Sequence, residues 1–160
     1  MAKANPEASA EIDAPLELVW SVMLHTDSYP AWNPFVVRAD CARPEVGAPI
    51  LLHVRWANGQ GVRSPERISV VDGPAAGADG TTTATLAYVF EGWPAKLGLV
   101  RGTRFQRLSQ APGGPTRYHT VEEFSGPLVR FAGPGRVAEG FARHAAALKA
   151  RAETLAADPP

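Results

Sequence analysis

Apolar and polar residues alternate with a helical period over the last stretch of the chain, from Pro134 to about Ala157. Apolar residues recur there three, four and seven positions apart, a spacing that places them on one face of a helix. They are Val137, Phe141, Ala145, Leu148, Ala152 and Leu155. Charged residues occupy the opposite flank, where Glu139 and Arg143 form an i,i+4 pair in the favourable order. An isolated helix would leave this stripe in water, so we expect the rest of the chain to cover it.

The N-terminal part of the chain predicts one strand and two short helices. Residues 8–13 fit a short strand. Residues 15–24 fit an amphipathic helix, because Pro15 suits the first helical position and the apolar residues that follow share one face. Residues 25–33 fit a turn or a second short helix, which the next proline ends.

From Phe35 onward the apolar period changes to two, which is typical of strands with one buried face. The six predicted strands are residues 35–41, 49–56, 62–71, 81–90, 100–109 and 116–124. Asn58-Gly59 is a strong signal for a hairpin turn, and residues 72–80 and 92–99 fit loops. Strands joined by hairpins, with helices towards the two ends of the chain, predict an antiparallel α+β fold.

Composition narrows the class of protein. The 160 residues fit a single domain, residues 1–160, with an ordered core of about 9–155. Sixteen basic and sixteen acidic residues leave no net charge, which argues against a nucleic-acid partner. The only cysteine, Cys41, excludes an internal disulfide and a cysteine-based metal cluster. No apolar run approaches the roughly 20 residues of a membrane span, and residues 1–9 lack the apolar core of a signal peptide, so we expect a cytoplasmic protein.

Three short segments resemble a known superfamily. They are Ile12-Asp13-Ala14-Pro15 before the first helix, Tyr29-Pro30-Ala31-Trp32-Asn33-Pro34-Phe35, and Ser125-Gly126-Pro127-Leu128 after the last strand. Together with the long terminal helix they resemble the START/polyketide-cyclase/birch-pollen-allergen (SRPBCC) superfamily. The resemblance implies a helix-grip fold, in which a curved antiparallel sheet of about seven strands wraps the terminal helix and leaves a cavity. Members variously bind lipids, sterols, aromatic natural products or hormones, and some cyclise or hydroxylate substrates, so the fold alone does not choose a function.

Polar residues on the predicted inner face of two strands are the candidates for chemistry. The alternation of inward and outward positions along these strands places Arg104, Tyr118 and Glu122 on the face that we expect to line the cavity. One interpretation is an ion pair between Arg104 and Glu122, since buried charges need partners. In the other, Arg104 or Tyr118 hydrogen-bonds a ligand oxygen while Glu122 acts as an acid or base. Glu66 is a further candidate on the same grounds.

Aromatic residues supply the expected walls, because ligand pockets are mainly apolar with a few placed polar groups. The residues that we expect to contact a ligand are Trp32, Val54, Trp56, Tyr88, Phe90, Trp93, Arg104, Tyr118, Glu122, Phe131 and Phe141. Trp32 lies where the resemblance implies a lid, and Trp93-Pro94 is a second candidate gate.

The sequence contains no motif for a metal, a cofactor or a classical catalytic nucleophile. No two of the four histidines have a metal-ligand spacing, and we expect His53 and His119 to lie at the surface or the cavity rim. No nucleophile elbow and no phosphate-binding loop occur. We therefore expect no cofactor and no metal.

Three functions remain open at this stage. The first is binding or carriage of a small hydrophobic molecule, aromatic, polyketide-like or lipid-like, in the cavity. The second is a polyketide cyclase or aromatase that uses Arg104, Tyr118 and Glu122. The third is a closed core that serves protein contact, which a cavity below about 300 Å³ would favour. Homodimer formation is left open.

Overall fold

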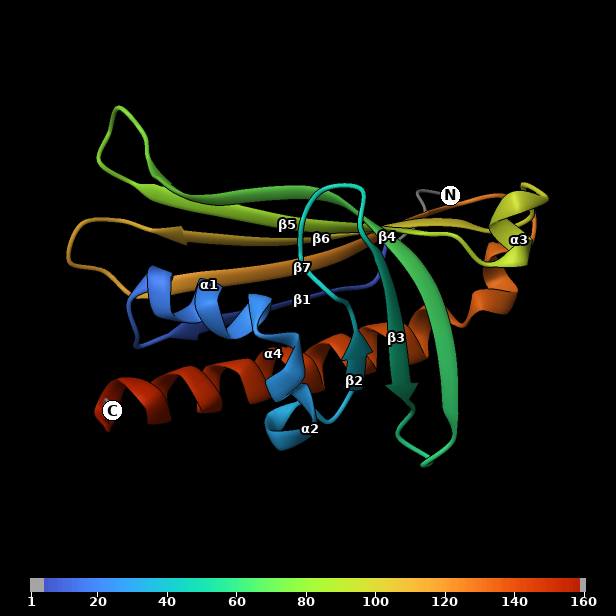
Figure 1. Ribbon diagram of the computed structural model, residues 1–160, viewed down its shortest axis with the longest axis horizontal. Coiled ribbons are helices and arrows are strands. Elements are labelled where there is room, and N and C mark those ends of the chain that lie inside the picture. The colour runs from blue at the N-terminus through green and yellow to red at the C-terminus, as the bar shows by residue number, and fades with distance from the viewer. Residues whose placement is uncertain (1–4, 159–160) are drawn as a thin grey trace.

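An antiparallel sheet of seven strands curves over one long helix (Figure 1). The computed structural model describes residues 5–158, so the expectations for residues 1–4 lie outside the described part. The strands are β1 (Glu7–Ile12), β2 (Val36–Asp40), β3 (Pro49–Arg55), β4 (Gly61–Ala76), β5 (Thr82–Phe90), β6 (Arg101–Gln110) and β7 (Thr116–Ser125). Their order in the sheet is β1-β7-β6-β5-β4-β3-β2, so β2 to β7 follow one another as hairpins and β1 pairs with the last strand.

The helices lie at the concave side and at the ends of this sheet (Figure 1). They are α1 (Leu16–Leu24), α2 (Tyr29–Trp32), α3 (Trp93–Lys96) and α4 (Pro134–Ala157), with 3-10 turns η1 (Thr26–Ser28) and η2 (Val129–Ala132). Gly133 precedes α4 with φ +70°, a left-handed conformation that favours glycine, and Pro134 then occupies the first turn. None of the helices within residues 5–158 combines the length and the apolar character needed to cross a membrane.

The predicted stripe of α4 packs against the sheet. Val137, Phe141, Ala145, Leu148 and Ala152 are buried, and Leu155 packs against the same core. Gly140 is buried on the same face of the helix. A Cβ at this position would overlap the Phe35 ring, so no larger residue fits without a shift. The glycine therefore lets the chain after α2 approach the helix closely.

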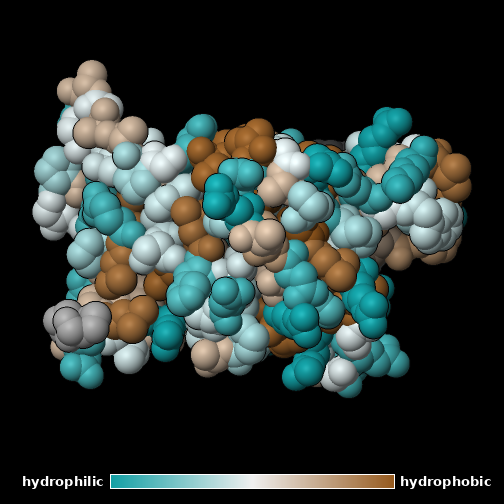
Figure 2. Space-filling model, viewed as in Figure 1, coloured by the Kyte–Doolittle hydropathy of each residue, from teal (hydrophilic) through white to brown (hydrophobic). Residues whose placement is uncertain are grey.

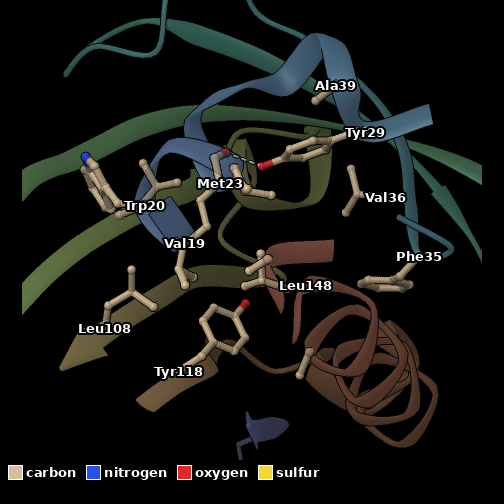
Figure 3. Close-up of a cluster of buried hydrophobic side chains, with 14 of the residues drawn as sticks. Val19, Trp20, Met23, Tyr29, Phe35, Val36, Ala39, Leu108, Tyr118 and Leu148 are labelled. Atoms are coloured by element: carbon tan, nitrogen blue, oxygen red, sulfur yellow. Dashed lines mark hydrogen bonds between the residues drawn. The ribbon is translucent and has the colours of Figure 1, made fainter. Parts of the chain in front are cut away.

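Buried hydrophobic side chains pack together between the sheet and α4 (Figure 3). There Val19 and Met23 of α1 meet Leu108 of β6 and Leu148 of α4, all nearly inaccessible to water. The Tyr29 hydroxyl donates to the Met23 carbonyl at 2.6 Å and so ties α2 to the end of α1. A continuous apolar core thus closes the end of the molecule that α1 covers.

The architecture confirms the α+β helix-grip prediction, including the two short helical segments after the first strand. Two local predictions were wrong. Residues 72–76 are strand rather than loop, because Ala75 and Ala76 still pair with Thr83 and Thr82 of β5. Trp93–Lys96 forms a short helix within the predicted loop 92–99, helped by a proline in its first turn.

Candidate ligand-binding cavity

A cavity of about 410 Å³ opens between the sheet and the first turns of α4, at the end of the molecule that α1 does not cover. Strands β2 to β7 contribute its walls, together with α3, η2 and α4. The apolar and aromatic residues that line it include Phe35, Leu52, Val54, Trp56, Phe90, Trp93, Val100, Phe124, Phe131, Val137 and Phe141. The volume lies within the usual range for small-molecule sites.

Aromatic rings pack against one another along one wall. Phe35 lies 5.9 Å from the Phe141 ring in a T-shaped pair and 5.9 Å from the Trp56 ring. The Arg136 guanidinium covers the Trp56 ring at 4.5 Å from its centroid. These contacts fix the orientation of the rings, so the wall is formed before any ligand enters.

The mouth of the cavity is apolar and exposed. Trp93 of α3 is 69% exposed and Phe131 of η2 is 66% exposed, although both line the cavity. Leu97, just after α3, is 66% exposed. Figure 2 shows hydrophobic surface at the end of the molecule where α3 lies. This placement agrees with a gate around Trp93-Pro94, whose role as a gate stays a prediction.

Arg104 lies at the inner end of the cavity. Its Nε donates to Thr120 Oγ1 at 2.9 Å and its Nη2 donates to the Tyr118 hydroxyl at 3.4 Å. Its guanidinium also stacks on the Phe141 ring, 4.3 Å from the centroid. Only 4% of Arg104 is exposed, so this cation is held in a fixed position next to the apolar walls.

Two carboxyl groups face the same space. Glu122 of β7 is only 8% exposed, and Glu66 of β4 accepts a hydrogen bond from Ser64 Oγ at 3.0 Å. Burial raises the pKa of Glu66 to about 7. Burial and the nearby charge of Glu66 raise the pKa of Glu122 to about 8, and Arg104 opposes both shifts. Gly102 leaves room for the Glu122 carboxylate, because a Cβ at that position would overlap Glu122 Oε1.

The predicted ion pair between Arg104 and Glu122 is not formed. The two residues are direct cross-strand neighbours, yet no salt bridge or hydrogen bond joins their side chains among residues 5–158. The Arg104 side chain instead extends along β7 towards Thr120 and Tyr118, where hydroxyl oxygens satisfy it. The Glu122 carboxylate therefore faces the cavity without a hydrogen bond from Arg104.

Tyr88 and Tyr118 lie deeper than the cavity wall. The Tyr118 hydroxyl donates to Gln106 Oε1 at 2.8 Å, and Gln106 Nε2 donates to the Tyr88 hydroxyl at 3.2 Å. All three side chains are buried, and burial raises the pKa of Tyr88 to about 12. Neither tyrosine is among the residues that line the cavity, so each could act on a ligand only through a neighbouring side chain. For Tyr118 that neighbour is Arg104, which lines the cavity and donates to the Tyr118 hydroxyl.

Trp32 also lies outside the cavity. It borders a separate surface hollow with Pro30 and Arg143, and its indole N–H donates to Ser28 Oγ at 3.2 Å. The remaining predicted contacts, namely Val54, Trp56, Phe90, Trp93, Arg104, Glu122, Phe131 and Phe141, all line the cavity. Whether these residues touch a ligand stays a prediction.

His144 is a buried polar residue that sequence reasoning missed. Its Nδ1 lies 3.1 Å from Asn33 Nδ2, its ring stacks on Tyr118, and Trp32 meets it edge to face. Burial and nearby Arg104 hold the pKa of His144 well below its usual value, so the ring is a neutral acceptor for the Asn33 amide. Its place three residues after Phe141 on the apolar stripe was the available signal.

The two other histidines singled out from the sequence lie towards the surface. His53 is partly buried beside Asp40 on the outer face of the sheet, and His119 is paired with Glu7 at the surface. Among residues 5–158 no three His, Cys, Asp or Glu side chains form a group that could hold a metal ion.

Sequence comparison finds no match for this chain, either among family models or among curated proteins. Solved structures, by contrast, share its fold over nearly the whole length. Zhui aromatase/cyclase from a Streptomyces species superposes with a TM-score of 0.70 at 18% identity, over 95% of this chain and 94% of that one. Ginseng major latex-like protein 151 from Panax ginseng gives a TM-score of 0.61 at 11% identity, over 93% and 97%.

A third structure is larger than this chain. The di-domain aromatase/cyclase BexL superposes with a TM-score of 0.65 at 14% identity over 98% of this chain, which spans about half (51%) of the BexL chain. At such identities the comparisons establish the fold and leave the function open. They confirm the helix-grip fold that the resemblance in the sequence implies.

Proposed function

We propose that this protein binds a small hydrophobic molecule, aromatic, polyketide-like or lipid-like, in the cavity between the sheet and α4. The observation that carries the proposal is the cavity itself. Its volume of about 410 Å³ exceeds the roughly 300 Å³ below which ligand sites are uncommon, and most of its walls are apolar. Both features support binding over the closed-core alternative.

The distribution of packing also supports binding. The half of the interior near α1 is filled by close-packed side chains, whereas the half near α3 leaves an open cavity among aromatic rings. Exposed apolar side chains at the mouth, such as Trp93 and Phe131, are unfavourable in water unless they serve a contact. An apolar ligand would cover part of this surface when it enters.

A second candidate function is acid–base catalysis on a bound carbonyl compound, as in a cyclase. The observation that favours it is the pair of carboxyl groups whose pKa values, about 7 and about 8, lie near neutral pH. Arg104 lies close enough to lower both pKa values and would stabilise a developing oxyanion. In this hypothesis Glu122 moves a proton on the ligand, and Glu122→Gln abolishes turnover while the ligand still binds.

Titration with Prodan, an uncharged and environment-sensitive dye, tests the proposed function. We expect its emission to shift to the blue and increase on binding to the wild-type protein. Val54→Phe places a phenyl ring in the cavity and should weaken Prodan binding by about tenfold or more. The ring occupies space that the dye needs, so the dye loses apolar contact area with the walls. Val37→Phe, on the outer face of neighbouring β2, makes the same change outside the cavity and should not alter it. Equal binding by all three proteins, or no binding by any, would contradict the proposal.

A further inference from the structure

The charges at the inner end of the cavity do not balance. One cation, Arg104, faces two carboxyl groups, Glu66 and Glu122. Arg104 already donates to Thr120 and Tyr118. When both carboxyls are ionised, the group carries one uncompensated negative charge in an apolar setting, which is unfavourable unless a positive partner arrives.

Both carboxyl groups also have unused acceptor oxygens. Glu122 makes no side-chain hydrogen bond or ion pair among residues 5–158, although it is more than nine-tenths buried and lines the cavity. Glu66 accepts from Ser64 through Oε1, while its Oε2 is buried and has no partner in the described part of the chain. Buried acceptors without a partner are rare in folded proteins, because desolvation without a hydrogen bond is unfavourable. The cavity therefore presents acceptors where an incoming molecule would supply donors.

We propose that Glu66 and Glu122 form a binding site for a protonated nitrogen, so that the ligand is a hydrophobic amine with an aromatic or alkyl body. The inference rests on the proposed function, because it names the chemical class of the molecule in the same cavity. The ammonium N–H groups would donate charge-assisted hydrogen bonds to Glu66 Oε2 and the Glu122 carboxylate. The rings of Trp56, Phe90 and Phe124 would add cation–π attraction and apolar contact.

The other charged groups at the cavity do not oppose this assignment. Arg63 of β4 and Arg136 of α4 also line the cavity, but both are exposed, and Arg136 stacks on Trp56. Water and salt screen such exposed charges strongly. Arg104 acts at the inner end, where it compensates one of the two carboxylates and leaves the second for the ligand. Without a ligand, a proton retained by the raised pKa values of Glu66 and Glu122 takes the place of the ammonium.

A matched pair of probes tests the inference: 2-(1-naphthyl)ethylamine and the uncharged 2-(1-naphthyl)ethanol. Their affinities are measured by quenching of the tryptophan fluorescence, since Trp56 and Trp93 line the cavity. We expect the amine to bind the wild-type protein about tenfold more tightly than the alcohol at a pH near 8, as a charge-assisted hydrogen bond predicts. Glu66→Gln and Glu122→Gln should each remove most of this preference. Glu123→Gln, one residue along β7 on the exposed face, is the matched control and should keep it.

The pH dependence gives an independent readout that needs no variant. Affinity for the amine should rise between about pH 6 and about pH 9 as the two carboxyls ionise, while affinity for the alcohol stays constant. The amine inference is overturned if both probes bind with equal affinity, or if the affinity for the amine does not change with pH over this range. Either result leaves the proposed function standing. Failure of both probes to bind overturns the amine inference and the proposed function together.

Discussion

Replacement of Glu122 by Gln should make the protein more stable at alkaline pH. In the folded protein the pKa of this carboxyl is about 8, mainly because burial disfavours its charged form. The unfolded chain loses the same proton near pH 4.5, the ordinary value for Glu. Between these two values the folded state holds a proton that the unfolded state has released. Raising the pH therefore favours unfolding, and glutamine cannot contribute to this effect.

The size of the effect follows from the shift in the pKa of Glu122. A group protonated only in the folded state lowers the free energy of unfolding by about 1.4 kcal/mol for each pH unit. From about pH 6 to the folded pKa of about 8, the wild-type protein should lose about 3 kcal/mol through Glu122. Glu66, whose pKa is raised to about 7, remains in the variant and keeps a smaller pH dependence. The variant should therefore gain about 3 kcal/mol relative to the wild type over this interval.

Urea unfolding at about pH 6 and about pH 9, followed by circular dichroism, measures the free energy of unfolding at each pH. Glu123→Gln is the matched control, since Glu123 is exposed on the same strand. The stability of this variant should change with pH in parallel with that of the wild type. If Glu122→Gln and the wild type lose stability in parallel between these pH values, the Glu122 carboxyl is not protonated in the folded protein. The raised pKa and the account of the cavity charges would then be refuted.

Two further predictions concern the packing around α4. Gly140→Ala should lower the free energy of unfolding by about 1–3 kcal/mol, because the new methyl group overlaps the Phe35 ring; Gly135→Ala, where the methyl group meets open space, should be neutral or stabilising in the same urea assay. His144→Gln should reduce the loss of stability below about pH 6.5, because the unfolded chain binds a proton that the buried, Asn33-bonded ring does not take up. Parallel acid unfolding curves for this variant and the wild type would contradict the second prediction.

Alternation along the strands was enough to predict which face of β6 and β7 is buried. Arg104, Tyr118 and Glu122 all point inward, as a period of two requires once the apolar positions fix the register. The periodicity of α4 likewise predicted its bounds. In the structure Gly133, which has a positive φ, precedes the first turn of the helix. Local patterns of this kind depend only on neighbouring residues.

The interactions of those inward side chains could not be predicted from the pattern. Arg104 has several partners within reach of its long side chain, and it donates to Thr120 and Tyr118 rather than to the directly opposite Glu122. Which part of the interior is open also depends on how distant elements pack. For that reason Tyr88 lies in the filled half, whereas Phe131, in a short 3-10 turn, reaches the mouth of the cavity.

Native mass spectrometry of the purified protein, alone and after addition of Prodan, tests most directly whether the cavity holds a small hydrophobic molecule. The account predicts an adduct of one small molecule per chain, either an apolar compound acquired during expression and recovered by extraction, or the added dye. The Val54→Phe variant should show less of it, because the larger side chain occupies the cavity. A wild-type protein that carries no adduct in either sample would contradict the account and favour a closed core that serves protein contact.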